Sequence, residues 1–151
     1  MLIRPVTKEE RLQSAQLLTI ESGDLTISAA DDAIHCDYTL QIGAEGTDGP
    51  AISITDCDEG LEAAALHVAL GDIRIRASDD CLNAANSDLS GFDFSMDISG
   101  GTISAYTTDG DGFDSNGSMT ISGGTPPEKP DGGTPPERPD NASEPPGPGN
   151  L

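Results

Sequence analysis

The sequence contains no tryptophan, and aromatic residues make up only 3% of its 151 positions. Tyr38 and Tyr106 are too few for an aromatic platform on which sugar rings could stack. Basic residues are also scarce, with 7 lysines and arginines against 27 acidic residues and a net charge of −20. Nucleic acid needs a basic face for its phosphates, so this composition excludes it as a partner.

Long apolar runs are missing as well, so no membrane-inserted segment is predicted. Residues 1–5 contain no apolar stretch long enough to act as a signal peptide. The sequence has only three cysteines, Cys36, Cys57 and Cys81, and this number is odd. We therefore expect small buried thiols rather than a disulfide framework or a cysteine metal site.

One six-residue motif occurs four times, in the order small, acidic, acidic, small, apolar, polar. Its copies are residues 30–35, 57–62, 78–83 and 109–114, and the last copy has Asp109 in place of the small residue and Gly110 in place of the first acid. In every copy an acid lies two places before the apolar residue, and a side chain able to bind a metal follows it. A functional interpretation has to explain why these acids recur in register.

Short stretches with alternating apolar and polar residues surround the motif, and each predicts a very short strand. The steps from the first apolar residue of a stretch to the apolar residue of the motif are 9, 9, 9 and 10, for Leu25 to Ile34, Ile52 to Leu61, Ile73 to Leu82, and Ile103 to Phe113. The repeat is therefore about 22 residues long, with insertions only at turns, which is typical of a solenoid.

Three short strands per repeat without a helical period predict an all-β fold, a parallel β-helix of about four coils. The predicted inner columns, stacked ~4.8 Å apart, are Leu25/Ile52/Ile73/Ile103, Ile34/Leu61/Leu82/Phe113 and Leu40/Leu66/Met96/Met119. Solenoids normally cap their ends. We therefore expect this short rod to be a piece of a longer β-helix or to rely on its neighbours, and the sequence leaves its oligomeric state open.

Composition divides the chain into three parts. Residues 1–18 predict a lead-in or a short capping helix, because residues 7–10 fit a capping box. The β-helix is expected over residues 19–124. Residues 125–151 contain two near copies of a proline-rich segment, and we expect a disordered, extended tail.

The acids of the motif are expected to form external rows, because each apolar residue points inward. One row contains Asp32, Glu59, Asp80 and Asp111, and a parallel row contains His35, Glu62, Asn83 and Asp114. Like charges ~4.8 Å apart repel unless a cation lies between them. Calcium prefers six to eight oxygens, which these side chains and the turn carbonyls can supply. Simply solvated acidic turns are the alternative.

The candidate calcium ligands are the acids of the motif together with one amide. They are Asp31, Asp32, Asp58, Glu59, Glu62, Asp79, Asp80, Asn83, Asp109, Asp111 and Asp114. Asp109 is included because Gly110 replaces the first acid in the fourth copy.

Several runs that contain these motifs resemble a known family. The runs are residues 28–35 with 37–40, 59–62, 77–80 with 82–84, and 110–117. They resemble the calcium-binding, right-handed parallel β-helix carbohydrate-binding proteins related to family 9 pectate lyases, over roughly residues 25–124. The resemblance implies an extracellular or cell-surface protein that uses Ca²⁺. It also implies binding, without cleavage, of acidic polysaccharide such as polygalacturonate or pectin, with cellulose as a further ligand.

Arg74 and Arg76 are the candidate carbohydrate-binding residues. They are the only lysines or arginines between residues 11 and 129, and their alternation with isoleucines places both on one outer face. An arginine offers a two-pronged fork to a sugar carboxylate. Pairing with nearby acids such as Asp72 or Asp97 is the alternative.

A polysaccharide lyase is one competing interpretation, because such an enzyme needs a base beside the uronate carboxylate. The family 9 lyases use a lysine, and the sequence has none between residues 8 and 129. Other pectate lyases use an arginine, so Arg74 or Arg76 would serve only if desolvated. We therefore predict a non-catalytic binder, with a lyase and a calcium-stabilised surface spacer as the alternatives.

Overall fold

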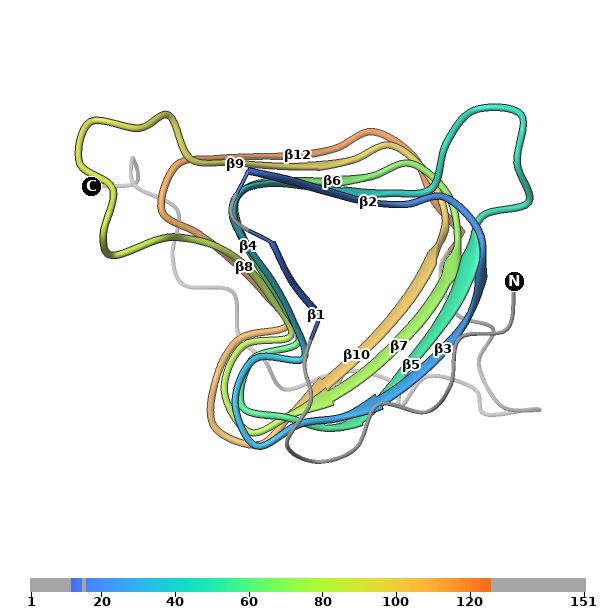
Figure 1. Cartoon of the computed structure of the whole chain (residues 1–151), viewed down its shortest axis with the longest axis horizontal. Coiled ribbons are helices and arrows are strands. Elements are labelled where there is room, and N and C mark those ends of the chain that lie inside the picture. The colour runs from blue at the N-terminus through green and yellow to red at the C-terminus, as the bar shows by residue number, and fades with distance from the viewer. Residues whose placement is uncertain (1–11, 15, 126–151) are drawn as a thin grey trace, which may run out of the picture.

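The computed structural model describes residues 12–14 and 16–125, and within these residues the chain forms strands and turns but no helix. The strands are β1 (Leu12–Ser14), β2 (Leu17–Ile20), β3 (Gly23–Ser28), β4 (Ile34–Ile42), β5 (Pro50–Asp56), β6 (Leu61–Val68), β7 (Asp72–Ala77), β8 (Leu82–Ala84), β9 (Ser95–Ile98), β10 (Thr102–Thr107), β11 (Phe113–Ser115) and β12 (Ser118–Ile121). All their pairings are parallel, and successive coils stack into a β-solenoid (Figure 1).

The coils have a three-sided outline when viewed along the stack (Figure 1). One side is a four-stranded sheet in the order β10-β7-β5-β3. The other two sides belong to a second sheet that bends around a corner, because β4 and β6 are long enough to contribute to both. The bend coincides with a register shift between Cys36 and Thr39 of β4. The two motif rows lie where the turn after the first sheet enters this second sheet.

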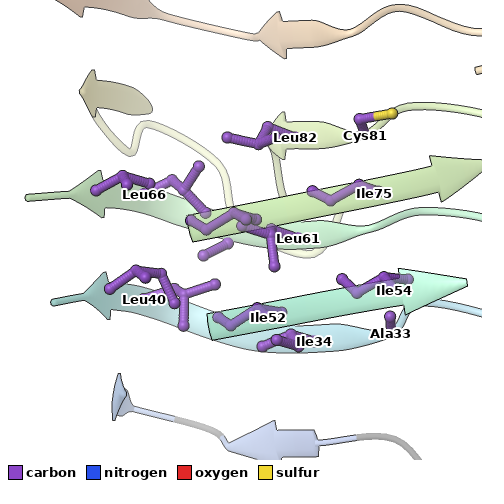
Figure 2. Packing of buried hydrophobic residues seen from close by; sticks show 14 of the residues in the cluster. Ala33, Ile34, Leu40, Ile52, Ile54, Leu61, Leu66, Ile75, Cys81 and Leu82 are labelled. Atoms are coloured by element: carbon purple, nitrogen blue, oxygen red, sulfur yellow. The ribbon is translucent and has the colours of Figure 1, made fainter. Parts of the chain in front are cut away.

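All three predicted columns are confirmed by the strand register. Leu25, Ile52, Ile73 and Ile103 are successive partners, as are Ile34, Leu61, Leu82 and Phe113, and Leu40, Leu66, Met96 and Met119. Their members in the inner coils are no more than 2% exposed, and they pack face to face across the interior (Figure 2). In the last coil Met119 is 42% exposed.

The solenoid begins earlier than the sequence indicates. Leu12 pairs with Ile34 and Leu18 pairs with Leu40, so β1 and β2 add a further partial coil before residue 19. The helix expected within residues 1–18 is therefore replaced by strand over Leu12–Ser14 and from Leu17 onward. The capping box at residues 7–10 and the proline-rich segment after Thr125 lie outside the described residues.

Insertions leave the stacked coils at their corners and do not interrupt the columns (Figure 1). The insertion at residues 85–94, which lengthens the third repeat, folds back onto the first motif-bearing coil. The side-chain amide of Asn86 donates to the carbonyl of Asp37 over 2.9 Å, and the Phe92 ring packs against Tyr38 with centroids 6.1 Å apart. The long spacing in this repeat is therefore a packed corner rather than a break in the register.

The cysteines are buried and free, as predicted. Burial is the main reason that the pKa of Cys57 rises to about 12, so this thiol stays protonated and behaves as a small core side chain. Within the part of the chain that the structure describes, no helix is long and apolar enough to cross a membrane.

Candidate metal centre and arginine face

Backbone hydrogen bonds between the coils bring the four motif copies into register. The amide of Ala33 donates to the carbonyl of Glu59 over 2.8 Å, that of Gly60 to Asp80 over 3.0 Å, and that of Cys81 to Asp111 over 3.0 Å. Asp32, Glu59, Asp80 and Asp111 thus form one row, named here the turn row. His35, Glu62, Asn83 and Asp114 are partners in the strand ladder and form the adjacent strand row.

The two rows are much less exposed than a solvated acidic surface would be. The side chains of Asp32, His35 and Glu62 are 14%, 15% and 17% exposed. Asn83 is 7% exposed, and its Oδ1 is buried without a hydrogen-bond partner. Carboxylates at this depth keep their charge only beside a cation or a donor.

Glu59 is held between its neighbours in both rows. Its Oε2 accepts a hydrogen bond from the Asn83 amide over 3.0 Å, which favours the charged form. Burial, a hydrogen bond shared with Glu62 and the charges of Glu62 and Asp80 outweigh this donor and raise the pKa of Glu59 to about 8. Without a cation, Glu59 therefore retains a proton at neutral pH and shares it with Glu62.

Asp80 continues the turn row towards the fourth coil. Burial raises the pKa of Asp80, while the hydrogen bond that its Oδ1 accepts from the Asp111 amide over 2.7 Å lowers it. Asp79, Asp114 and Asp111 raise it further through their charges. Protonation and a bound cation are the two ways to relieve this repulsion.

The stability of the metal-free protein is expected to fall as the pH rises from about 4.5 to about 8. Over this window the unfolded chain releases the proton of Glu59, whose ordinary pKa is 4.5, while the folded chain keeps it. Urea unfolding in the presence of a chelator measures this slope. Glu59→Gln should flatten it, whereas Glu45→Gln, at an exposed loop position, should not. An identical slope in the Glu59 variant would contradict the assignment.

A third set of acids lies further out on the turn. The amide of Asp58 donates to the Asp31 carbonyl over 3.2 Å and that of Asp79 to the Asp58 carbonyl over 3.0 Å, so these three acids stack. The Ser78 hydroxyl donates to Asp58 Oδ1 over 2.6 Å. In the fourth coil Gly110 lies against Asp79, and the Asp109 amide donates to the carbonyl of Ser78. All these acids are exposed, whereas among the acids of the two rows only Asp111 is exposed.

The turn carbonyls, expected to supply further ligands, also take part in hydrogen bonds between coils. Those of Asp31, Asp58, Glu59, Asp80 and Asp111 each accept an amide from a neighbouring coil. A carbonyl oxygen has a second lone pair, so these groups can still add to the side-chain oxygens of the two rows.

The expected ligand set leaves out His35, although this residue lies in the strand row. Its Nδ1 is 2.7 Å from Glu62 Oε1 and 3.2 Å from Asp32 Oδ2, and its Nε2 is 3.0 Å from Asp37 Oδ1. The signal in the sequence is the spacing of His35, three residues after Asp32 and two before Asp37. Alternation along a strand puts residues two apart on the same face.

Arg74 and Arg76 project from the outer face of β7, as the alternation predicts. Arg74 is 72% exposed and its Nη2 lies 3.4 Å from Asp72 Oδ2, so one of the expected acid pairings is present. Asp97, the other expected partner, lies 3.3 Å from His67. The Arg76 guanidinium lies 4.8 Å from the centre of the Tyr106 ring, and this pair forms an exposed stacked unit beside Arg74.

The two groups of candidate residues occupy consecutive parts of the same coils. The arginines lie on the four-stranded sheet, and the motif rows follow immediately after the turn that leaves it (Figure 1). Comparisons with family models, curated proteins and solved structures found no match to the chain, so its function has to be inferred from these residues and their surroundings.

Proposed function

We propose that this solenoid is a non-catalytic, calcium-dependent binder of acidic polysaccharide of the polygalacturonate type. The observation that carries the proposal is the pair of half-buried rows, in which Glu59 lies against Glu62 and the Asn83 amide, whose buried oxygen has no hydrogen-bond partner. Such an arrangement is costly in a metal-free protein and is relieved by a hard cation.

The two rows offer ligands of the chemical type that calcium selects. Glu59, Glu62 and Asp80 provide carboxylate oxygens and Asn83 provides the orphaned Oδ1, which are the hard oxygen ligands that calcium selects. Bound calcium would neutralise these acids and offer its remaining positions to water or to a sugar carboxylate. With a net charge of −20, the chain can approach a polyuronate only through such cations or through a local basic spot.

The outer face of β7 that carries Arg74 and Arg76, called the arginine face, supplies this basic spot. Arg74 and Arg76 are exposed side by side on β7, and Tyr106 supports the second of them. A guanidinium binds a carboxylate through two parallel hydrogen bonds, and the exposed Tyr106 ring adds an apolar surface for a sugar ring. Asp72 competes for Arg74, so we assign the larger share of glycan binding to Arg76.

The surroundings of the two arginines support binding rather than a lyase reaction. An arginine can act as a base only when desolvation makes its charged form unfavourable. Arg74 is largely exposed and lies beside an acid, and Arg76 stacks on an aromatic ring at the surface. Neither arginine is in the desolvated environment that an arginine base needs.

Retention on immobilised polygalacturonate with calcium, and release by a chelator, is the expected result. Arg76→Gln should weaken retention about tenfold, consistent with the loss of one charge-assisted contact worth about 1.4 kcal/mol. Fully methyl-esterified polygalacturonate is the matched ligand control, because its carboxylates are blocked. Lys129→Gln, which removes one positive charge from the proline-rich segment of the sequence, is the matched variant.

Each of the remaining outcomes would support a different function. Equal retention on the esterified polymer would rule out recognition of carboxylates. Calcium-dependent stability without retention would favour the structural spacer. Release of unsaturated, ultraviolet-absorbing products would establish a lyase.

A further inference from the structure

His35 converges with acids from two coils at one end of the rows. Its Nδ1 is 2.7 Å from Glu62 Oε1 on β6 and 3.2 Å from Asp32 Oδ2 in the turn before β4. The ligand atoms of these three side chains, named here the His35 triad, all lie within 4.8 Å of one another. This is the one group of three or more histidine, cysteine or acidic ligand atoms this close together among the described residues, and it includes a histidine nitrogen.

The second nitrogen of His35 provides an independent indication. Nε2 lies 3.0 Å from Asp37 Oδ1, in position to donate its hydrogen to that carboxylate. Histidines that bind metals almost always donate their other ring N–H to such an acceptor, which fixes the tautomer and raises the basicity of the ligand nitrogen. A proton held on Nε2 leaves the lone pair of Nδ1 facing Asp32 and Glu62.

Nδ1 is shielded from solvent, and neither of its short contacts has the geometry of a hydrogen bond. A nitrogen lone pair and two carboxylates at these distances repel one another unless a proton or a metal ion lies between them. A bound metal resolves this conflict for all three side chains.

We propose that the His35 triad binds a borderline divalent transition metal of the zinc class, with the fourth position left to water. Zinc bonds of about 2.0–2.2 Å in a tetrahedron place ligand atoms about 3.3 Å apart. The distance from Nδ1 to Asp32 already fits, and the distance to Glu62 needs to widen by about 0.6 Å. Calcium takes oxygen ligands, so the nitrogen donor distinguishes this end of the rows from the calcium-binding part.

The inference shares with the proposed function the premise that the rows hold cations, but it does not require polysaccharide binding. Asp32 and Oε1 of Glu62 become ligands of the transition metal, and Glu59, Asp80, Asn83 and the other oxygen of Glu62 remain for calcium. Titration with zinc in the presence of calcium, and with calcium in the presence of zinc, therefore tests the two metal assignments separately.

Calorimetric titration of the full, tag-free chain with zinc chloride, after chelator treatment and with calcium present, tests the proposal. We expect one zinc ion per chain. His35→Gln should lower the zinc affinity at least tenfold, and Asp37→Asn should lower it about 10–100-fold through loss of the second hydrogen bond. His67→Gln is the matched control, because His67 faces a single acid, Asp97, at 3.3 Å.

Imidazole NMR signals of the unmodified chain decide the question if His35→Gln does not fold. Zinc should shift the signals of His35 and leave those of His67 in place. No zinc binding, equal affinity in the His35 variant, or equal losses in both histidine variants would overturn the proposal.

Discussion

Removal of calcium is expected to lower the midpoint of thermal unfolding by about 10 °C. A ligand present at 100 times its dissociation constant stabilises the folded state by about 2.7 kcal/mol. In a domain of this size 1 kcal/mol corresponds to about 4 °C. The expected response is large because the metal-free rows bury several carboxylates against one another, and it should grow with the logarithm of the calcium concentration.

The neutralised double variant Glu59→Gln/Asp80→Asn identifies the acids responsible. It removes a buried proton-sharing carboxylate and its repelling neighbour, so it should be more stable than the wild-type chain in chelator and gain much less from calcium. The exposed pair Glu45→Gln/Asp48→Asn changes the net charge equally and should leave the calcium response intact. An undiminished response in the row variant would place calcium elsewhere.

The interior of the fold could be predicted because its residues recur at constant intervals along the sequence. A solenoid buries one residue of each kind at the same station of every coil, so constant intervals between apolar residues identify the columns. Leu25, Ile52 and Ile73 are fixed in this way without knowledge of any contact. The insertions did not spoil the count because they leave the coil at its corners.

The first strands could not be predicted because their hydrogen-bond partners lie far away in the sequence. Leu18 and Ile20 alternate like the later strands, but the residues before them carry a local helix-start pattern. Pairing with β4 decides the matter, and that pairing depends on a strand about 20 residues further along.

The alignment of the candidate-site residues between coils could be predicted from the sequence, but the burial of their side chains could not. Equal spacing of the motif copies places the acids in rows, whereas exposure depends on how each turn lies against the next coil. Two residues of the strand row show the difference: Asn83 is almost fully buried, and His35 makes contacts on both ring nitrogens. Spacing alone treats these positions as equivalent.

Gly60→Ala is expected to destabilise the protein by about 3 kcal/mol, at the upper end of the usual cost of overpacking. A Cβ at Gly60 would overlap the carbonyl oxygen of Cys81 and lie 2.6 Å from Cγ2 of Ile75. The first neighbour is a backbone atom of the next coil, and the second belongs to a buried core side chain. Neither can move away without disturbing the packing around it. Chemical unfolding at fixed calcium concentration measures the loss.

Gly112→Ala is the matched control, because Gly112 occupies the same place in the fourth copy of the motif. There the nearest atom to a new Cβ is that of Ala105, at 3.9 Å, an ordinary contact. The substitution should leave stability unchanged or raise it by up to about 1 kcal/mol, since alanine restricts the unfolded chain. Equal losses in both variants would mean that the motif needs glycine for its backbone and not for the space between coils.

The small residue of the motif connects packing to the proposed site. Gly60 follows Glu59 directly, and the Gly60 amide makes the hydrogen bond that aligns Glu59 with Asp80. A side chain that forces the second and third coils apart should therefore displace the turn row as well as the core. We expect Gly60→Ala to weaken calcium binding at temperatures where it is still folded, and Gly112→Ala to weaken it much less. Calcium titration of the two folded variants would separate this coupling from a simple loss of stability.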